Sequence, residues 1–328
     1  MTSVHDHALA HLLDPELLPF KERGAVFDIW DDIPAGRKLI ESALAEMLAP
    51  YPVRIDVPFE DIVLDGSDNP SGLKVRLYRP VNCESSAPVM LWLHGGGYIM
   101  GSLDMDVGFL QHLANAVACV IVSVDYRLAP EHPFPSALDD AYHALRWLHQ
   151  NAVQLDIDSQ RIAISGISGG GGLAAGLGLY ARDKAEMPVA FQLLLCPMID
   201  DRNSTPSSLL PLTGMAWDRR GNTNAWAAYL GREPNSDPIA APVSEYAAAA
   251  RVRNAAGLPP SFISVGSVDL FRDENIDYAR KLLEAGVPTN LHVYAGGFHA
   301  FECIAAGTAL AENSLNNIQE FIKKSFKK

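Results

Sequence analysis

The sequence has few cysteines, little positive charge and no long hydrophobic run. None of its 328 residues lies in an uninterrupted apolar stretch of the about 18 residues that a membrane-spanning helix needs, so membrane insertion is not expected. The N-terminal segment has no basic residue before an apolar run, unlike a secretory signal. The four cysteines are widely spaced without a CxxC pair, which favours reduced thiols in a cytoplasmic protein.

Acidic residues outnumber basic ones by 39 to 26, which gives a formal net charge of -13. Such a chain repels nucleic-acid phosphates and anionic membranes, so nucleic acid is not an expected partner. Hydrophobic residues make up 48% of the chain and charged residues 20%, a composition that supports a large core and excludes wholesale disorder. The composition therefore predicts a folded globular protein.

Apolar patterns alternate between strand-like and helix-like segments over most of the chain. Buried parallel strands give uninterrupted apolar runs, whereas amphipathic helices repeat apolar residues every three or four positions. We expect strands at residues 62–64, 73–78, 89–93, 118–124, 161–165, 191–196, 261–265 and 290–294, and helices at 35–47, 136–150, 171–185, 274–285 and 310–322. The alternation predicts an α/β fold with a mostly parallel central sheet and helices on both faces.

Residues 202–250 interrupt this alternation. The segment is rich in proline and glycine and has the composition of an insertion between two strands. Together with the helical residues 1–50 it is placed to cover one end of the sheet. We therefore expect a core formed by residues 51–201 and 251–328, with the other two segments lying over it.

The segment Gly166-Ile167-Ser168-Gly169-Gly170 follows a predicted strand and precedes a helix rich in small residues. It matches GxSxG, in which a tight strand-to-helix turn lifts the serine hydroxyl above the sheet and flanking glycines let backbones approach. The alternative is a glycine-rich turn that packs the helix on the strand or cradles a phosphate. It is not a P-loop, because no Lys-Ser/Thr follows the glycines.

A second glycine-rich segment, His94-Gly95-Gly96-Gly97-Tyr98, comes directly after an apolar run that ends at Leu93. Consecutive glycines leave backbone N–H groups uncovered, and such donors can hold an oxyanion as it forms. The alternative is an ordinary turn after a strand. Its occurrence together with the serine turn favours an oxyanion hole.

Two polar residues in the C-terminal part of the chain, Asp269 and His299, each follow a predicted strand. Parallel sheets gather such residues at the carboxyl edge of their strands. Asp269 has an alternative role as a cap of the next helix, but Asp273 is the better capping candidate. The order Ser168, Asp269, His299 is the one found in α/β hydrolases.

The chain resembles the hormone-sensitive-lipase-like branch of the α/β hydrolases, also called bacterial esterase family IV. It shares with that family HGGGY, GxSxG and residues 125–135, which read DYRLAPEHPFP. The resemblance implies an α/β-hydrolase fold with a helical cap built from residues 1–50 and 202–250. It also implies a serine carboxylesterase that acts on small-molecule esters with short to medium acyl chains and needs no cofactor.

These motifs suggest a role for each candidate residue. Ser168 would be the nucleophile, His299 the general base and Asp269 the residue that orients the histidine. The oxyanion would be held by the N–H groups of Gly96, Gly97 and Gly169. The candidates for the substrate pocket are Tyr98, Leu210, Met215 and Trp217. The last three, with Trp226, could equally form the core of the cap.

The chain departs from the family pattern beside two of these residues. Family members usually carry Asp or Thr before the nucleophile and Ala after it, where this sequence has Ile167 and Gly169. Gly169 keeps the N–H group but on a looser backbone, and Ile167 removes a polar group. The acid motif, usually DPL, reads Asp269-Leu270-Phe271. The differences concern the shape of these loops rather than the presence of the three catalytic candidates.

Other functions remain compatible with the same fold and residues. A hydrolase of amides or small peptides would use the same three residues, because only the leaving group differs. A non-catalytic binding protein would resemble the plant hormone receptors that lack the working histidine, whereas His299 is present here. A homodimer paired along the edge strand at 290–294 is also open. His5, His7 and His11 are expected to be solvent-exposed, so no metal site is expected.

Overall fold

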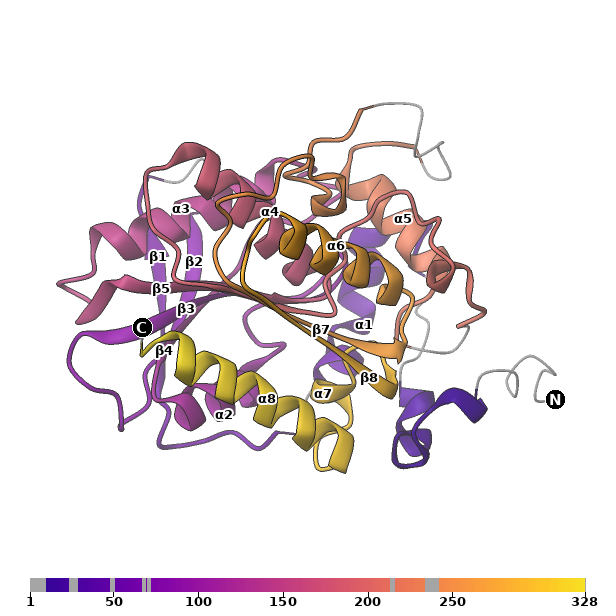
Figure 1. The fold of residues 1–328 in the computed structure, drawn as a ribbon, viewed down its shortest axis with the longest axis horizontal. Coiled ribbons are helices and arrows are strands. Elements are labelled where there is room, and N and C mark those ends of the chain that lie inside the picture. Colours follow the sequence, from indigo (N-terminus) through magenta and orange to yellow (C-terminus); the bar gives the residue numbers. More distant parts are fainter. Residues whose placement is uncertain are drawn as a thin grey trace.

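A computed structural model describes residues 10–23, 29–47, 51–66, 69, 72–212, 216–233 and 242–327. Its centre is an eight-stranded sheet between helices (Figure 1). The strands are β1 (Phe59–Leu64), β2 (Leu73–Tyr78), β3 (Ala87–Leu93), β4 (Val120–Val124), β5 (Ile157–Ile167), β6 (Gln192–Leu195), β7 (Ser261–Val268) and β8 (Thr289–Phe298). The α-helices are α1 (Ile33–Met47), α2 (Val107–Val117), α3 (Ser136–Gln150), α4 (Gly169–Lys184), α5 (Arg219–Tyr229), α6 (Arg272–Glu284), α7 (Phe301–Ile304) and α8 (Ala309–Ser325). Short 3-10 helices are η2 (Ala10–Leu12), η3 (Pro15–Arg23), η4 (Ser207–Leu209) and η5 (Ala249–Arg251).

The strand order in the sheet is β1-β2-β4-β3-β5-β6-β7-β8. β2 is antiparallel to both of its neighbours, β1 and β4, and every other neighbouring pair is parallel. The predicted α/β fold with a mostly parallel sheet is therefore confirmed. Because parallel strands point the same way, the loops that leave β3, β5, β6, β7 and β8 meet at one edge of the sheet.

Helices cover both faces of the sheet. In Figure 1, α2 and α8 lie on one face, and α3, α4 and α6 lie on the other. Every residue of the inner strands β3 and β4 is buried, because each face of these strands packs against helices. Nearly all of the buried apolar side chains that the structure describes belong to one continuous cluster.

Two helices outside these layers, α1 and α5, contact loops at the carboxyl edge of the sheet. Arg37 of α1 donates hydrogen bonds to the carbonyl groups of Ile99, after β3, and Ala129, after β4. Tyr229 of α5 stacks on Tyr98, with ring centroids 3.9 Å apart. These contacts fit a cap over this edge, and the division at residues 50, 201 and 250 stays a prediction.

The observed elements differ from the predicted ones in two respects. The structure has three helices that the sequence patterns did not single out, namely α2, α5 and α7. The helix expected at 274–285 begins at Arg272, so the prediction that Asp273 caps it is wrong. Asp273 lies inside the first turn, where its Oδ2 accepts a hydrogen bond from the Ser207 N–H at 2.7 Å. Its side chain therefore ties α6 to the inserted segment.

The structure also bears on the expectations about membranes and disulfides. In the described ranges, no helix combines the length and the apolar character needed to cross a bilayer. All four cysteines are free thiols, with Cys83 half-buried and the other three buried.

The first turn of α4 lies unusually close to the end of β3. An ideal Cβ on Gly170 would lie 2.0 Å from the carbonyl oxygen of Leu93 and 2.2 Å from that of His94. Both neighbours are backbone atoms of a buried strand end, so they cannot move aside as a flexible side chain can. Only glycine at this position lets the helix start where it does.

We therefore expect Gly170→Ala to lower the free energy of unfolding by about 3 kcal/mol, the upper range for overpacking a core. Urea titration followed by circular dichroism measures this change. The matched control is Gly178→Ala in the same helix, where the new Cβ would meet only side-chain ends, Gln192 Oε1 at 2.9 Å and Ile164 Cδ1 at 3.3 Å. Equal stability of the two variants would contradict the proposed contact.

Candidate active site

Ser168 occupies the tight turn between β5 and α4. Its φ of 56° and ψ of -122° are strained for a residue that carries a Cβ. Hydrogen bonds hold the turn: the Ser168 N–H donates to the Leu195 carbonyl, and the Ser168 carbonyl accepts from the Met198 N–H, both at 2.9 Å. The backbone thus has the sharp strand-to-helix form that the GxSxG motif predicts.

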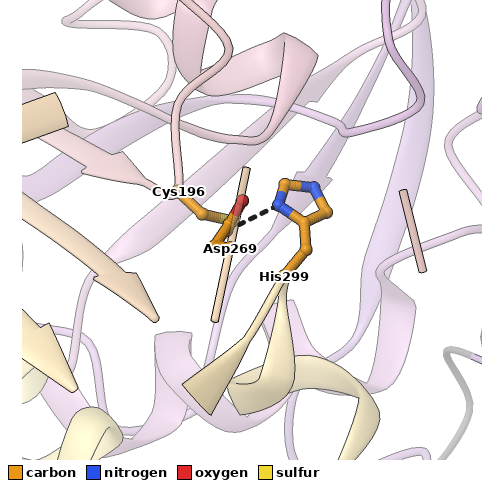
Figure 2. A group of neighbouring side chains, drawn as sticks. All are labelled: Cys196, Asp269 and His299. Carbon is orange, nitrogen blue, oxygen red and sulfur yellow. Dashed lines mark hydrogen bonds and ion pairs between the residues drawn. The ribbon is translucent and has the colours of Figure 1, made fainter. Parts of the chain in front are cut away.

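The structure brings Ser168, His299 and Asp269 together, although they follow three different strands. Nε2 of His299 lies 2.8 Å from Oγ of Ser168, and Nδ1 lies 2.8 Å from Oδ2 of Asp269. Figure 2 shows the imidazole with Nδ1 toward the Asp269 carboxyl group. The serine and histidine are 6% exposed and the aspartate is fully buried.

The hydrogen bonds of Asp269 determine how His299 presents its two nitrogens. The carboxylate accepts from the Phe271 N–H through Oδ1 and from His299 through Oδ2. A carboxylate accepts only, so Nδ1 of the imidazole carries the proton and Nε2 presents its lone pair to the Ser168 hydroxyl. This arrangement can remove a proton from the hydroxyl group.

The glycine loop (residues 94–100) lies beside this turn. Gly96 and Gly97 have φ of 109° and 59°, and the Gly96 carbonyl accepts from the N–H groups of Ile99 and Met100. An ideal Cβ on Gly169 would lie 2.8 Å from the Gly97 nitrogen, so the two backbones are in contact. Among the described residues, no backbone carbonyl accepts from the N–H of Gly96, Gly97 or Gly169. These donors are available to an oxyanion.

His94 fixes the glycine loop through contacts with Gly95 and Tyr126. Its ring is buried, stacks on Tyr126 with centroids 4.2 Å apart, and donates from Nδ1 to the Gly95 carbonyl at 2.8 Å. Burial lowers the pKa of His94 to about 4, so the ring is neutral near pH 7. Tyr126 in turn donates to the His94 carbonyl. His94 therefore holds the loop in place.

Among the pocket candidates, Trp217 lies against the glycine loop. An ideal Cβ on Gly97 would be 2.6 Å from Cη2 of the indole, so the ring edge touches the Gly97 backbone. The indole is partly exposed. Its Nε1 donates to Asn222 at 3.3 Å, and its ring meets Trp30 edge to face with centroids 6.4 Å apart. Trp217 is thus held between Trp30, Asn222 and the glycine loop.

The other pocket candidates are placed differently. Tyr98 is fully buried and its hydroxyl donates to the Met198 carbonyl at 2.6 Å, which argues against a place in the pocket wall. Leu210 is partly buried at the end of η4. Met215 lies outside the described residues. Trp226 is buried against Tyr98 and belongs to the core of the molecule.

Comparison with known proteins agrees with this geometry. A family model described as the α/β hydrolase fold matches residues 90–303. The chain belongs to the α/β-hydrolase family. It is 38% identical over 243 residues to Esterase LipI of Mycobacterium tuberculosis, with 74% of each chain covered. It is 34% identical over 266 residues to Carboxylesterase NlhH of that species, covering 79% of this chain and 82% of the other. The solved structure of Bacterial Heroin Esterase is 37% identical and has a TM-score of 0.89, covering 96% of this chain and 98% of that one.

The predicted membership of the hormone-sensitive-lipase-like branch of the α/β hydrolases is thus confirmed. In this α/β hydrolase, Cys196 follows β6 and lies beside the Asp269–His299 pair (Figure 2). Its Sγ, an Asp269 oxygen and a His299 nitrogen all lie within 4.8 Å of one another, a grouping that raises the question of a metal.

The geometry of the Cys196, Asp269 and His299 group suits a proton better than a metal ion. A tetrahedral zinc ion about 2.1 Å from each ligand would hold nitrogen and oxygen about 3.4 Å apart, whereas Nδ1 and Oδ2 are 2.8 Å apart. Burial, with smaller contributions from Glu302 and Asp269, also raises the pKa of the Cys196 thiol well above its ordinary value. The thiol is therefore protonated, and a protonated thiol is a poor metal ligand.

Glu302 is a buried carboxyl group near the catalytic candidates that the sequence patterns did not single out. It lies in α7, three positions after His299, and the Ser264 hydroxyl lies 3.5 Å from its Oε1. Burial is the main cause that raises the pKa of Glu302 to about 7, and the Asp269 carboxylate adds to the shift, while hydrogen bonds and His299 oppose it. The sequence signal was a lone glutamate inside an apolar segment.

Gly169→Ala tests the close contact between α4 and the glycine loop. The new Cβ would meet backbone atoms, Gly97 nitrogen at 2.8 Å and Tyr98 nitrogen at 2.9 Å, so the loop must shift. We expect kcat/KM for p-nitrophenyl acetate to fall about tenfold, because misplaced donors stabilise the transition state less. Gly178→Ala serves as the control in the same helix. A value within about twofold of wild type for Gly169→Ala would contradict the expected clash.

Glu302→Gln tests the buried carboxyl group through the pH dependence of stability. The folded state keeps the Glu302 proton up to a pKa of about 7, whereas an ordinary glutamate releases it near 4.5. The folded state therefore binds more protons between these values, and wild-type stability falls as the pH rises through them. Between pH 5 and pH 8 we expect the wild type to lose about 2 kcal/mol more than the variant.

Urea titrations at the two pH values measure the effect of Glu302→Gln. The control is Glu320→Gln, at an exposed position of α8, which should follow the wild type at both pH values. Parallel losses of stability in the wild type and in Glu302→Gln would contradict the buried, proton-bearing state.

Proposed function

We propose that this hydrolase cleaves short- to medium-chain carboxylic esters through an acyl-enzyme on Ser168. The observation that carries the proposal is the hydrogen-bonded series from Asp269 through His299 to the Ser168 hydroxyl, with 2.8 Å at each His299 nitrogen. Relatives named esterase and carboxylesterase support the same class of reaction.

In the acylation step, Oγ of Ser168 attacks the ester carbonyl carbon while its proton passes to Nε2 of His299. Asp269 stabilises the imidazolium that forms. The carbonyl oxygen becomes an oxyanion, which the N–H groups of the glycine loop and of Gly169 would hold. When the tetrahedral intermediate collapses, the alcohol leaves with the proton from Nε2 and the acyl group stays on Oγ.

In the deacylation step, water takes the place of the alcohol. His299 removes a proton from the water as its oxygen attacks the acyl carbon, and a second tetrahedral oxyanion forms at the same donors. Its collapse returns the proton to Ser168 and releases the carboxylic acid. Water is the co-substrate of the reaction, and the proposal includes no cofactor.

We place the substrate pocket between the core and a cap formed by residues 1–50 and 202–250. The contact of Trp217 with Gly97 supports this location, because it sets a bulky ring beside the oxyanion donors. The Trp30–Trp217 contact supports a joint role of the two cap segments. A bulky wall at this point favours short and medium acyl chains over long ones. Leu210 and Met215 stay candidates for the same wall.

Two alternatives differ from this proposal in what the enzyme turns over. An amide or peptide hydrolase would use the same residues on an amine leaving group, and the names of the relatives favour esters. A binding protein without catalysis would not need the His299–Ser168 hydrogen bond, which is present. The cytoplasmic location and a homodimer along β8 stay predictions.

A panel of p-nitrophenyl esters, from acetate through octanoate to palmitate, tests the proposal beside the matching p-nitroanilides. We expect the highest kcat/KM for the acetate to octanoate esters and no measurable cleavage of the anilides. In Ser168→Ala, kcat for the esters should fall about 10⁴-fold or more, because the nucleophile is lost.

Ser204→Ala, at an exposed serine of the inserted segment, is the control and should keep wild-type rates. Faster turnover of anilides than of esters would favour the amide hydrolase. Ester cleavage that persists in Ser168→Ala would contradict the proposed nucleophile.

A further inference from the structure

Arg37 of α1 uses its whole guanidinium group to bind two loops of the core. Nε donates to the Ile99 carbonyl at 2.7 Å and Nη2 to the Ala129 carbonyl at 2.9 Å. Nη1 and Nη2 also form a forked pair with Glu131, at 2.9 Å and 3.0 Å. The Arg37 side chain is 23% exposed, so these contacts are largely shielded from solvent. The planar shape of the group, with fixed donors, lets one side chain hold three acceptors.

The acceptors of Arg37 lie in the loops that shape the active site. Ile99 belongs to the glycine loop, and its N–H donates to the Gly96 carbonyl at 3.1 Å. Ala129 and Glu131 belong to the segment 125–135, whose Ala129 N–H donates to the Tyr98 carbonyl at 3.0 Å. Arg37 thus bridges the two loops at the point where they already bind each other.

A second contact joins the same cap segment to the same loop. Trp30, just before α1, meets Trp217 edge to face, and Trp217 touches the Gly97 backbone. Both routes from the N-terminal cap segment therefore end within residues 96–99. One route ends on the Ile99 carbonyl group and the other on the Gly97 backbone.

We propose that Arg37 is a positioning residue that sets the oxyanion donors of Gly96 and Gly97 from the cap, through the Ile99 carbonyl. The proposal rests on the proposed esterase function. If Arg37 is lost, the Ile99 carbonyl loses its charged partner, and the turn closed on the Gly96 carbonyl becomes free to shift. The N–H groups of Gly96 and Gly97 then no longer point to the same position of the substrate oxyanion.

Misplaced oxyanion donors affect the transition state more than the bound ester. The negative charge on the carbonyl oxygen develops only as Ser168 attacks, so its stabilisation is lost mainly from kcat. A cap that merely shaped the pocket would instead change KM. Displacements of about 1 Å can cost up to about a hundredfold in rate. We expect kcat of Arg37→Met to fall about tenfold or more, with KM changed less than about threefold.

The experiment compares Arg37→Met and Arg37→Lys with a matched arginine at the opposite edge of the sheet. Arg161 binds Asp158, Glu84 and the Ser86 carbonyl in the same manner, but before β3 and at the start of β5. Arg161→Met should keep wild-type kcat. Arg37→Lys keeps the charge but cannot reach three acceptors at once, so its kcat should also fall.

Affinity for a trifluoromethyl ketone separates positioning from general destabilisation. Oγ of Ser168 adds to the ketone carbon of this inhibitor, and the oxygen of the resulting hemiketal lies as an oxyanion at the N–H donors. The inhibition constant of the Arg37 variants should therefore rise in parallel with their loss of kcat/KM. Thermal melting of each variant confirms that it is folded at the assay temperature. If Arg37→Met does not fold, Arg37→Lys alone carries the test.

Unchanged kcat and unchanged inhibitor affinity in the folded Arg37 variants would overturn the proposal, as would a loss confined to KM. Glu131→Gln keeps the bonds from Arg37 to both carbonyl groups and should stay within about threefold of wild-type kcat. The esterase proposal fails separately, if Ser168→Ala retains activity, so the two results are distinguishable.

Discussion

The site depends on one constraint, the contact of bare backbones where α4 begins against the end of β3. Side chains are excluded there because an ideal Cβ on Gly170 would overlap the carbonyl oxygens of Leu93 and His94, at 2.0 Å and 2.2 Å. This approach places the Ser168 turn next to the glycine loop, where the backbones of Gly169 and Gly97 are in contact. The strained φ of Ser168 is held between the buried end of β5, the buried strand β6 and the buried first turns of α4.

Three buried acidic groups, Asp269, Glu302 and Cys196, lie near His299 and differ in how their surroundings affect their protonation. Asp269 is fully buried but accepts two hydrogen bonds, which offset the cost of removing its charge from water. Glu302 is buried as well, and burial raises its pKa to about 7. The Cys196 thiol is kept protonated by burial and by these two carboxyl groups. Of these groups, the Asp269 carboxyl group is the one hydrogen-bonded to the imidazole.

Much of this arrangement follows from local patterns in the sequence. The apolar runs without alternation predicted buried parallel strands, and parallel strands bring their carboxyl ends together whatever their separation along the chain. For that reason the sequence alone places Ser168, Asp269 and His299 at the same edge of the sheet. Contacts between distant side chains leave no such pattern. The burial of Tyr98 against α5, the bond of Asp273 to Ser207 and the bridge from Arg37 depend on how α1, α5 and the segment after β6 pack on the sheet. The sequence patterns thus predict the sheet and the meeting of the three catalytic candidates, whereas the cap formed by residues 1–50 and 202–250 stays a prediction.

Covalent labelling tests the central claim, that the fold makes Ser168 a uniquely reactive nucleophile, most directly. A fluorophosphonate forms a stable adduct with a serine activated by a histidine, and digestion with peptide mass mapping identifies the labelled residue. The account predicts one adduct per chain, on the peptide that contains Ser168, and none in Ser168→Ala or after unfolding. An adduct on a different serine, or a folded protein that takes up no label, would contradict it.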